Sequence, residues 1–295
     1  MQHTIKSLLL LLFILLVSAQ PASSSKSVRW WVSYNFVDNN LSVITGQATG
    51  IYTYAGLSVN DSGDFNCSNS DDSLTSHLKP YKDAGLTVTP ALDITNSSLT
   101  SGTALANVDQ VTEWAGRQKE NGLIDGIMLD YEPTTSDSDW VEKYAAYIKA
   151  LKTSLATVNV DLEMCTSAWG ILDGHTVDSG YGIYADTGVN LMQSMSGTYF
   201  GTNITRNIEN VELELKQGVS LEQLAVGIGT MIQDGCETGP GKWDYDWNEE
   251  NLRAFIKEVD DLGAEKLVIW RADIDNEGDC TEEYFLDVAR EWLEE

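Results

Sequence analysis

Two carboxylates stand two residues apart in a short apolar segment: Asp130 and Glu132, within Asp125–Pro133 (DGIMLDYEP). Because side chains of a strand alternate between its faces, Met128, Asp130 and Glu132 share one face. Like charges this close disfavour double ionisation, so one carboxyl is expected to keep its proton to an unusually high pH. A carboxyl with a raised pKa suits a general acid. The alternative is an ordinary acidic strand end, where Asp and Glu cap helices or face solvent.

The rest of the chain alternates short β-like segments with amphipathic helices, which are the elements that must position these carboxylates. Strands are predicted at Val28–Phe36, Gly50–Gly56, Leu86–Ile94, Asp125–Pro133, Val160–Ala168, Gly188–Met195, Leu224–Met231 and Lys266–Trp270. Helices are predicted at Asp72–Gly85, Ala106–Glu120, Trp140–Val158, Ile204–Lys216, Asn248–Leu262 and Thr281–Leu293.

This alternation predicts a parallel sheet, and its eight repeats predict closure into a single-domain α/β protein, a (β/α)8 TIM barrel. A doubly wound open sheet is the structural competitor, but it usually carries a Gly-rich phosphate turn after its first strand, and the sequence has none there. Barrel enzymes carry their chemistry at the carboxyl ends of the strands. Pro133 marks such an end directly after Glu132.

The N-terminus indicates export. Lys6 precedes an apolar run from Leu8 to Val17, and small residues follow at Ser18 and Ala19. This pattern predicts a signal peptide over residues 1–19, a Ser-rich leader over 20–27 and the barrel domain over 28–295. The run is too short for a membrane span. We therefore expect a secreted protein, or one in the lumen of the secretory, lysosomal or vacuolar pathway.

The composition of the chain limits the classes of molecule that it is expected to bind. The chain has 45 Asp and Glu residues against 18 Lys and Arg, a net charge of −27. This balance argues against nucleic acid and anionic membrane surfaces as partners. With three His residues and no metal-binding spacing among the four Cys, we expect no metal site, and nothing in the sequence calls for a cofactor.

Cysteines and glycosylation sequons are further features of an exported chain. Cys236 and Cys280 fall after the seventh and eighth strands, in loops that neighbour each other at one barrel face, so we predict a disulfide between them. A pair between Cys67 and Cys165 is left open, since Cys165 lies inside a strand. The sequons predict surface positions and glycan sites at Asn40, Asn60, Asn66, Asn96 and Asn203.

The fourth predicted strand resembles the D-G-x-D-x-D-x-E signature of the chitinase-type glycoside hydrolases of family 18. Asp125, Gly126, Asp130 and Glu132 match it, and Met128 stands where the family has its middle Asp. Across the mature chain the resemblance extends to the order of strands. It implies that Trp270, at the end of the eighth strand, is the aromatic platform under the sugar.

The resemblance also implies an activity: retaining hydrolysis of β-1,4 bonds next to N-acetylglucosamine, assisted by the acetamido group of the substrate. Chitin, chitooligosaccharides and the N-glycan core are the substrates implied. Glu132 would protonate the glycosidic oxygen and then activate water, and Asp130 would orient the acetamido group. Asp125 would support the strand and its hydrogen bonds.

Three places depart from the family pattern. One is Met128. Another is the end of the third strand, which reads Pro90–Asp93 instead of S-x-G-G, and Asp93 there is either an extra site carboxylate or a loop cap. The last departure is in the sixth strand, where the family has M-x-Y-D. Met192 matches its Met and is expected at the substrate, while the Tyr and Asp positions fall on Ser194 and Met195. A one-residue slip would change this alignment, and Gln193 is a residue that could compensate.

Two interpretations of function rest on this resemblance, and a third is a barrel of unrelated chemistry that matches the signature by chance. In the first, the barrel is an active glycosidase, which the retention of Glu132 favours, because the general acid is the group that catalysis can least spare. In the second, it is a carbohydrate-binding protein of the chitinase-like lectin kind, which the departures favour. Trp169, after the fifth strand, is a further candidate for sugar stacking in both readings.

Overall fold

The computed structural model describes residues 26–32, 41, 44–131, 138–166, 180–195, 203–229, 247–272 and 283–295. Eight parallel strands form its centre. They are β1 (Ser27–Val32), β2 (Gly50–Val59), β4 (Thr87–Ile94), β5 (Gly126–Leu129), β6 (Asp161–Cys165), β7 (Leu191–Met195), β8 (Leu224–Gly229) and β9 (Lys266–Ala272). All the predicted strands are present.

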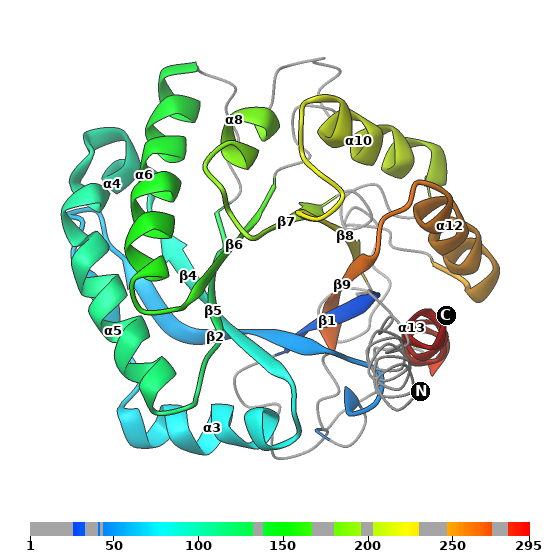
Figure 1. The fold of residues 1–295 in the computed structure, drawn as a ribbon, viewed down its shortest axis with the longest axis horizontal. Coiled ribbons are helices and arrows are strands. Elements are labelled where there is room, and N and C mark those ends of the chain that lie inside the picture. The colour runs from blue at the N-terminus through cyan, green and yellow to red at the C-terminus, as the bar shows by residue number, and fades with distance from the viewer. Residues whose placement is uncertain are drawn as a thin grey trace, which may run out of the picture.

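The strands close into a barrel. Each pairs with its neighbours in chain order, and β1 pairs in parallel with both β2 and β9, which joins the two ends of the sheet. Figure 1 shows the ring of strands with the helices outside it. The predicted TIM barrel is therefore confirmed. A short strand, β3 (Phe65–Cys67), was not predicted. It pairs antiparallel with β2 and is not one of the eight strands of the closed barrel.

Helices surround the barrel (Figure 1). They are α3 (Asp71–Asp83), α4 (Asn96–Ser101), α5 (Val108–Glu120), α6 (Ser138–Ala156), α8 (Tyr181–Ala185), α10 (Ile204–Lys216), α12 (Glu249–Asp261) and α13 (Glu283–Glu294), with a 3-10 helix, η1 (Thr103–Asn107), before α5. The six predicted helices are present, and α4, α8 and η1 are additional. Within the described ranges no helix is both long and apolar enough to cross a membrane.

Local sequence explains several boundaries. Asn203 and Asn248 cap α10 and α12, each with its side-chain oxygen accepting a backbone N–H of the first turn. Gly263 takes a φ of +79° after α12, a conformation that favours glycine. Gly56 was predicted to end the second strand, but β2 continues to Val59, and Gly56 lies within it at a φ of +73°, in an irregular stretch of the pairing with β4.

Buried side chains form two clusters, as the barrel geometry requires. The larger lies between strands and helices and includes residues from almost every element, such as Ile127 and Met192. The smaller, which we call the inner cluster, lies inside the barrel and contains Trp31, Tyr52, Ala91, Met128, Cys165, Leu191, Met195, Ala225 and Val268. Trp270 packs against it. The inner cluster carries the site described next.

Candidate functional site

Asp130 lies at the carboxyl end of β5, directly after Leu129. Its backbone N–H donates to the carbonyl of Leu92 on β4 at 3.3 Å, so strand pairing continues through this residue. Oδ2 of Asp130 accepts a hydrogen bond from the Tyr54 hydroxyl on β2 at 2.7 Å. Oδ1 accepts a longer one from the Cys165 thiol on β6 at 3.7 Å. Groups on β2 and β6 thus orient this carboxyl.

Met128 and Glu132 are the other two residues of the predicted strand face. Met128 is fully buried in the inner cluster, so an apolar side chain occupies the strand position next below Asp130 on that face. Glu132 lies outside the described residues, and its role as the acid stays a prediction.

The carboxyls at this end of the barrel are harder to ionise than usual. Burial raises the pKa of Asp130, and the hydrogen bonds from Tyr54 and Cys165 oppose this shift only in part. Burial also raises the pKa of Asp93 on β4, and the charge of Asp130 adds to the effect. The pKa of Tyr54 is raised by burial and by Asp130, so its phenol stays a donor. Asp93 is therefore coupled electrostatically to Asp130, which the sequence left open.

Tyr54, which contacts Asp130, packs against two tryptophan rings. The Trp31 ring centroid lies 5.3 Å from that of Tyr54 and 5.1 Å from that of Trp270. Tyr54 and Trp270 meet edge to face, with centroids 6.2 Å apart and planes at 88°. Tyr54 is 37% exposed and Trp270 half-buried, so both present surface at the carboxyl end of the barrel. A carboxyl beside exposed aromatic rings can bind a polar ring with apolar faces, such as a sugar.

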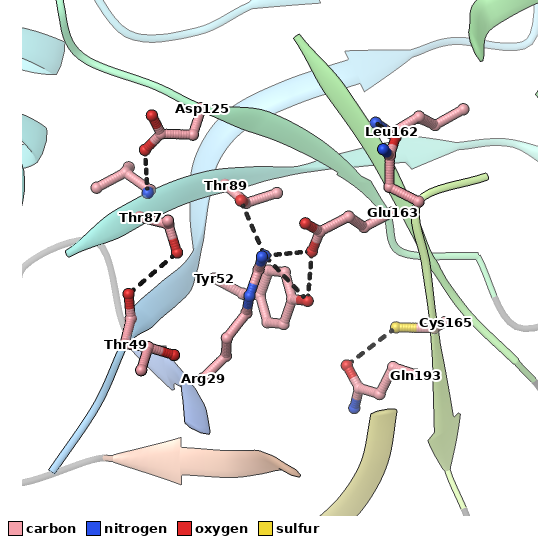
Figure 2. Close-up of polar contacts among 12 residues, drawn as sticks. Arg29, Thr49, Tyr52, Thr87, Thr89, Asp125, Leu162, Glu163, Cys165 and Gln193 are labelled. Atoms are coloured by element: carbon pink, nitrogen blue, oxygen red, sulfur yellow. Dashed lines mark hydrogen bonds and ion pairs between the residues drawn. The ribbon is translucent and has the colours of Figure 1, made fainter. Parts of the chain in front are cut away.

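Gln193 on β7 faces the barrel interior. Its Oε1 accepts a hydrogen bond from the Trp31 indole at 3.0 Å, and its Nε2 lies 3.2 Å from the sulfur of Met195. The Cys165 thiol also contacts Oε1, at 3.7 Å (Figure 2). The structure thus joins Gln193 to the ring and the thiol that border Asp130.

The register of β7 differs by one residue from the alignment expected. Gln193 and Met195 face inward, whereas Met192 is buried in the larger cluster between strands and helices. Ser194 also faces outward, where its hydroxyl accepts from Asn210 of α10 at 3.2 Å. The structure therefore does not bring Met192 to the site, and Met195, not Ser194, takes the last inward position of the strand.

Asp125 lies at the opposite end of β5 from Asp130, five residues away, which is about 16 Å along an extended strand. It accepts from Lys82 at 2.5 Å, from Lys119 at 3.4 Å and from the backbone N–H of Val88 at 2.9 Å. Burial alone would raise its pKa, but these partners outweigh it and lower the pKa. Asp125 therefore ties β5 to β4 and the helices and is not brought to the substrate end.

A buried polar cluster fills the barrel below the inner aromatic rings. Arg29 on β1 forms an ion pair with Glu163 on β6, and Tyr52 donates to the same carboxylate oxygen (Figure 2). Arg29 also reaches the hydroxyl of Thr89 at 3.3 Å. Burial alone would lower the pKa of Arg29, but Glu163 and Tyr52 outweigh burial, and the pKa is raised. Strand alternation places Arg29 on the face of Trp31, and Glu163 on the face of Cys165, so the sequence carried this signal.

A second buried carboxyl, Glu214 on α10, lies outside the barrel against β6 and β7. Its Oε1 accepts from Thr166 at 3.2 Å and from Asn210 at 3.0 Å, and Oε2 has no hydrogen-bond partner among the described residues. Burial raises its pKa to about 8, although hydrogen bonds from Ser194, Thr166 and Asn210 oppose the shift. Sequence analysis missed it, because a Glu in an acidic amphipathic helix looks like a solvent-facing residue.

The remaining predicted positions are of three kinds. The described sequons are exposed, as expected, at Asn60, Asn66, Asn96 and Asn203. Cys67 has a free thiol, so it is not joined to Cys165. Trp169, Cys236, Cys280 and Asn40 lie outside the described residues. In the part of the chain that the structure describes, no three His, Cys, Asp or Glu side chains are grouped to hold a metal ion.

No protein-family model matches the sequence, and no curated protein matches it. Solved structures are similar to it at low identity. A chitinase from Bacteroides thetaiotaomicron matches with a TM-score of 0.67 and 12% identity, over 91% of this chain and 96% of that one. A class V chitinase from Pseudomonas fluorescens Pf-5 matches with a TM-score of 0.66 and 13% identity, over 92% of this chain and 100% of that one.

A glycoside hydrolase family 18 N-acetylglucosaminidase from Paenibacillus barengoltzii matches with a TM-score of 0.66 and 13% identity, over 90% of this chain and 99% of that one. At such identities a structural likeness establishes the fold and leaves the activity to be argued from the site. The chain has the barrel fold of the chitinase-type glycoside hydrolases of family 18.

Proposed function

We propose that this protein is a secreted glycoside hydrolase that cleaves β-1,4 bonds next to N-acetylglucosamine with retention of configuration. One observation carries the proposal: Asp130 accepts a hydrogen bond from Tyr54 at 2.7 Å, and the partly exposed ring of Tyr54 packs edge to face with the half-buried ring of Trp270. A fixed carboxyl next to aromatic faces, at the carboxyl end of a barrel strand, suits a sugar that carries a polar substituent.

The proposed mechanism divides the work between two side chains. Glu132, two residues beyond Asp130 in the sequence, gives its proton to the glycosidic oxygen as the bond to the anomeric carbon breaks. The acetamido oxygen of the substrate forms the new bond to that carbon, and Asp130 stabilises the positive charge that develops on the acetamido group. Water then attacks the same carbon as the bond from the acetamido oxygen to that carbon breaks, and a proton of the water passes to Glu132, which restores the acid.

A second candidate function is sugar binding without cleavage. The burial of Met128 in the inner cluster favours it, since no carboxyl stands at that position to share a proton with Asp130. In this case the barrel would keep the aromatic rings as a binding surface and lose turnover.

The deciding experiment is hydrolysis of N-acetylglucosamine oligomers of defined length by the mature chain. Glu132→Gln tests the acid, and Glu120→Gln, at an exposed position that ends α5, is the matched control. Cleavage that is lost only in Glu132→Gln, with a product that first appears as the β-anomer, supports the proposal. Oligomers of glucose, which lack the acetamido group, should not be cleaved.

Saturable binding of the oligomers by all three proteins without cleavage would instead support the sugar-binding protein. Neither binding nor cleavage would contradict both.

Export and glycosylation belong to the same proposal. Residues 1–19 would be removed, and glycans would be attached at the exposed sequons, such as Asn60 and Asn66. Expression in a secreting eukaryotic cell should give a protein in the medium that starts at Gln20 and loses mass after enzymatic deglycosylation. Retention in the cell with an intact N-terminus would contradict it.

A further inference from the structure

We propose that Tyr54 is a positioning residue for Asp130, and that its hydroxyl takes the place of the carboxyl neighbour that Met128 does not supply. The effect on turnover rests on the proposed function, whereas the effect on Asp130 itself does not.

The contacts of Asp130 single out Tyr54. Its phenol donates to Oδ2 at 2.7 Å, which is a short hydrogen bond to a carboxyl oxygen. The other donor, the Cys165 thiol, lies 3.7 Å from Oδ1, and a thiol is a weak donor. Below Asp130 on the same face of the chain stands the apolar side chain of Met128. Of the two donors that the described residues supply to this carboxyl, Tyr54 is therefore the stronger.

The backbone of β2 aims Tyr54 at Asp130. The parallel register with β4 runs from Thr53 opposite Pro90 directly to Leu57 opposite Leu92, so β2 carries extra residues at this point. Bulges of this kind re-aim side chains and occur next to active sites. Tyr54 lies within the irregular stretch.

Other contacts hold the irregular stretch in place. The side-chain amide of Asn69 donates to the carbonyl of Ala55 at 2.8 Å, and the N–H of Ser68 donates to the carbonyl of Gly56 at 2.9 Å. A side chain at position 56 would collide with the Ser68 hydroxyl, which would be 2.1 Å away. The bulge thus depends on a glycine at the position where it turns, and it is tied on its outer side.

The charges around Asp130 explain why one hydroxyl matters. From β2 it faces Tyr54, from β4 Asp93, and from β6 Cys165. Burial disfavours ionisation of Asp130, whereas the hydrogen bonds from Tyr54 and Cys165 favour it, and the charge of Asp130 in turn raises the pKa of Asp93. Without the Tyr54 hydroxyl, the pKa of Asp130 should rise further and its carboxyl should be free to turn.

Tyr54→Phe removes the hydroxyl and keeps the ring. The first readout needs no substrate: carbon-13 NMR titration of side-chain carboxyls in aspartate-labelled protein, with Asp130→Asn to assign the signal. The pKa of Asp130 should be higher in Tyr54→Phe than in the parent. Tyr284→Phe is the matched control, since it removes a hydroxyl that donates to the carbonyl of Trp247 at 2.6 Å, away from the site.

Activity is the second readout. In Tyr54→Phe, kcat/KM for N-acetylglucosamine oligomers should fall about 10- to 100-fold, mainly in kcat, and its acidic limb should move to higher pH. Cys165→Ala should shift the Asp130 titration less than Tyr54→Phe does. An Asp130 titration that is unchanged in Tyr54→Phe, or shifted more by Cys165→Ala, overturns the inference. A shifted titration in a protein that cleaves no oligomer upholds the Tyr54 assignment and overturns the proposed activity instead.

Discussion

Arg29 on β1 and Glu163 on β6 form an ion pair inside the barrel, across 134 residues of sequence. Their side chains are 16% and 3% exposed, so both charges have given up most of their water. Hydrogen bonds from Tyr52 and to Thr89 complete the cluster (Figure 2). The net attraction within such a buried pair adds little to the stability of the fold, because both charges lose their hydration. Removal of one partner is costly, since it leaves the other charge buried and unpaired.

The first prediction concerns this pair. Glu163→Gln should lower the free energy of unfolding by about 3–5 kcal/mol, because Arg29 would stay buried without a counter-charge. Denaturant unfolding followed by tryptophan fluorescence measures the loss. In the control, Glu291→Gln breaks an ion pair with Arg253 at the surface and should cost less than about 1 kcal/mol.

A double variant separates the two explanations of that loss. Replacing Arg29 and Glu163 together by Met removes both charges and should recover much of the stability, because no unpaired charge remains. If the double variant is no more stable than Glu163→Gln, the net attraction between the two charges stabilises the barrel, and the desolvation argument is wrong.

The second prediction concerns pH and Glu214. Its pKa is raised by burial from 4.5 to about 8, so between these values the folded chain holds a proton that the unfolded chain has lost. The stability it contributes should therefore fall as pH rises through this window, by a few kcal/mol at most, on the order of 1.4 kcal/mol per unit of pH. Glu214→Gln, which mimics the protonated form, should remove this fall.

The measurement is the free energy of unfolding at about pH 5, 6, 7 and 8, which together cover the window in which it should fall. Glu212→Gln, at an exposed position of the same helix, is the control and should keep the pH dependence of the parent. Equal slopes in Glu214→Gln and Glu212→Gln would show that another group causes the fall.

The sequence predicted the barrel well, because period-two and helical patterns repeat along the chain and each strand or helix is defined locally. The strand pattern singled out Asp130, and the family resemblance implied Trp270; the structure places both near the carboxyl ends of their strands, and their roles stay predictions. The register of β7 could not be predicted. Met192 and Gln193 are neighbours and so face opposite sides of the strand, and hydrophobicity does not distinguish the inside of a barrel from its helix-covered side. The role of Tyr54 could not be predicted either, because the direction of its side chain depends on a bulge set by the pairing of β2 with β4.

The third prediction concerns Met128. Met128→Leu should change the free energy of unfolding by less than about 1.5 kcal/mol, because the volume and the apolar character of the inner cluster are kept. Under the proposed function it should also leave kcat/KM nearly unchanged. Met128→Asp, which restores the family signature, should destabilise the fold, because the new carboxyl would be fully buried among apolar side chains. A stable and more active Met128→Asp protein would contradict the view that this site works through Tyr54.

The last prediction concerns Trp270, which under the proposed function is the platform beneath the sugar. Its ring packs on Trp31 with centroids 5.1 Å apart and is only half-buried, so it presents a face without depending on the ligand for its position. Trp270→Ala, made in the Glu132→Gln background so that no ligand is cleaved, should weaken oligomer binding by about 30-fold in calorimetry. Trp270→Phe should lose less, because it keeps an aromatic face, and Leu105→Ala, at an exposed residue of η1, should bind as the parent does. If Trp270→Ala binds normally while its fold is intact by near-ultraviolet circular dichroism, the sugar does not stack on this ring, and Tyr54 would be the remaining exposed ring of the described site for the same test.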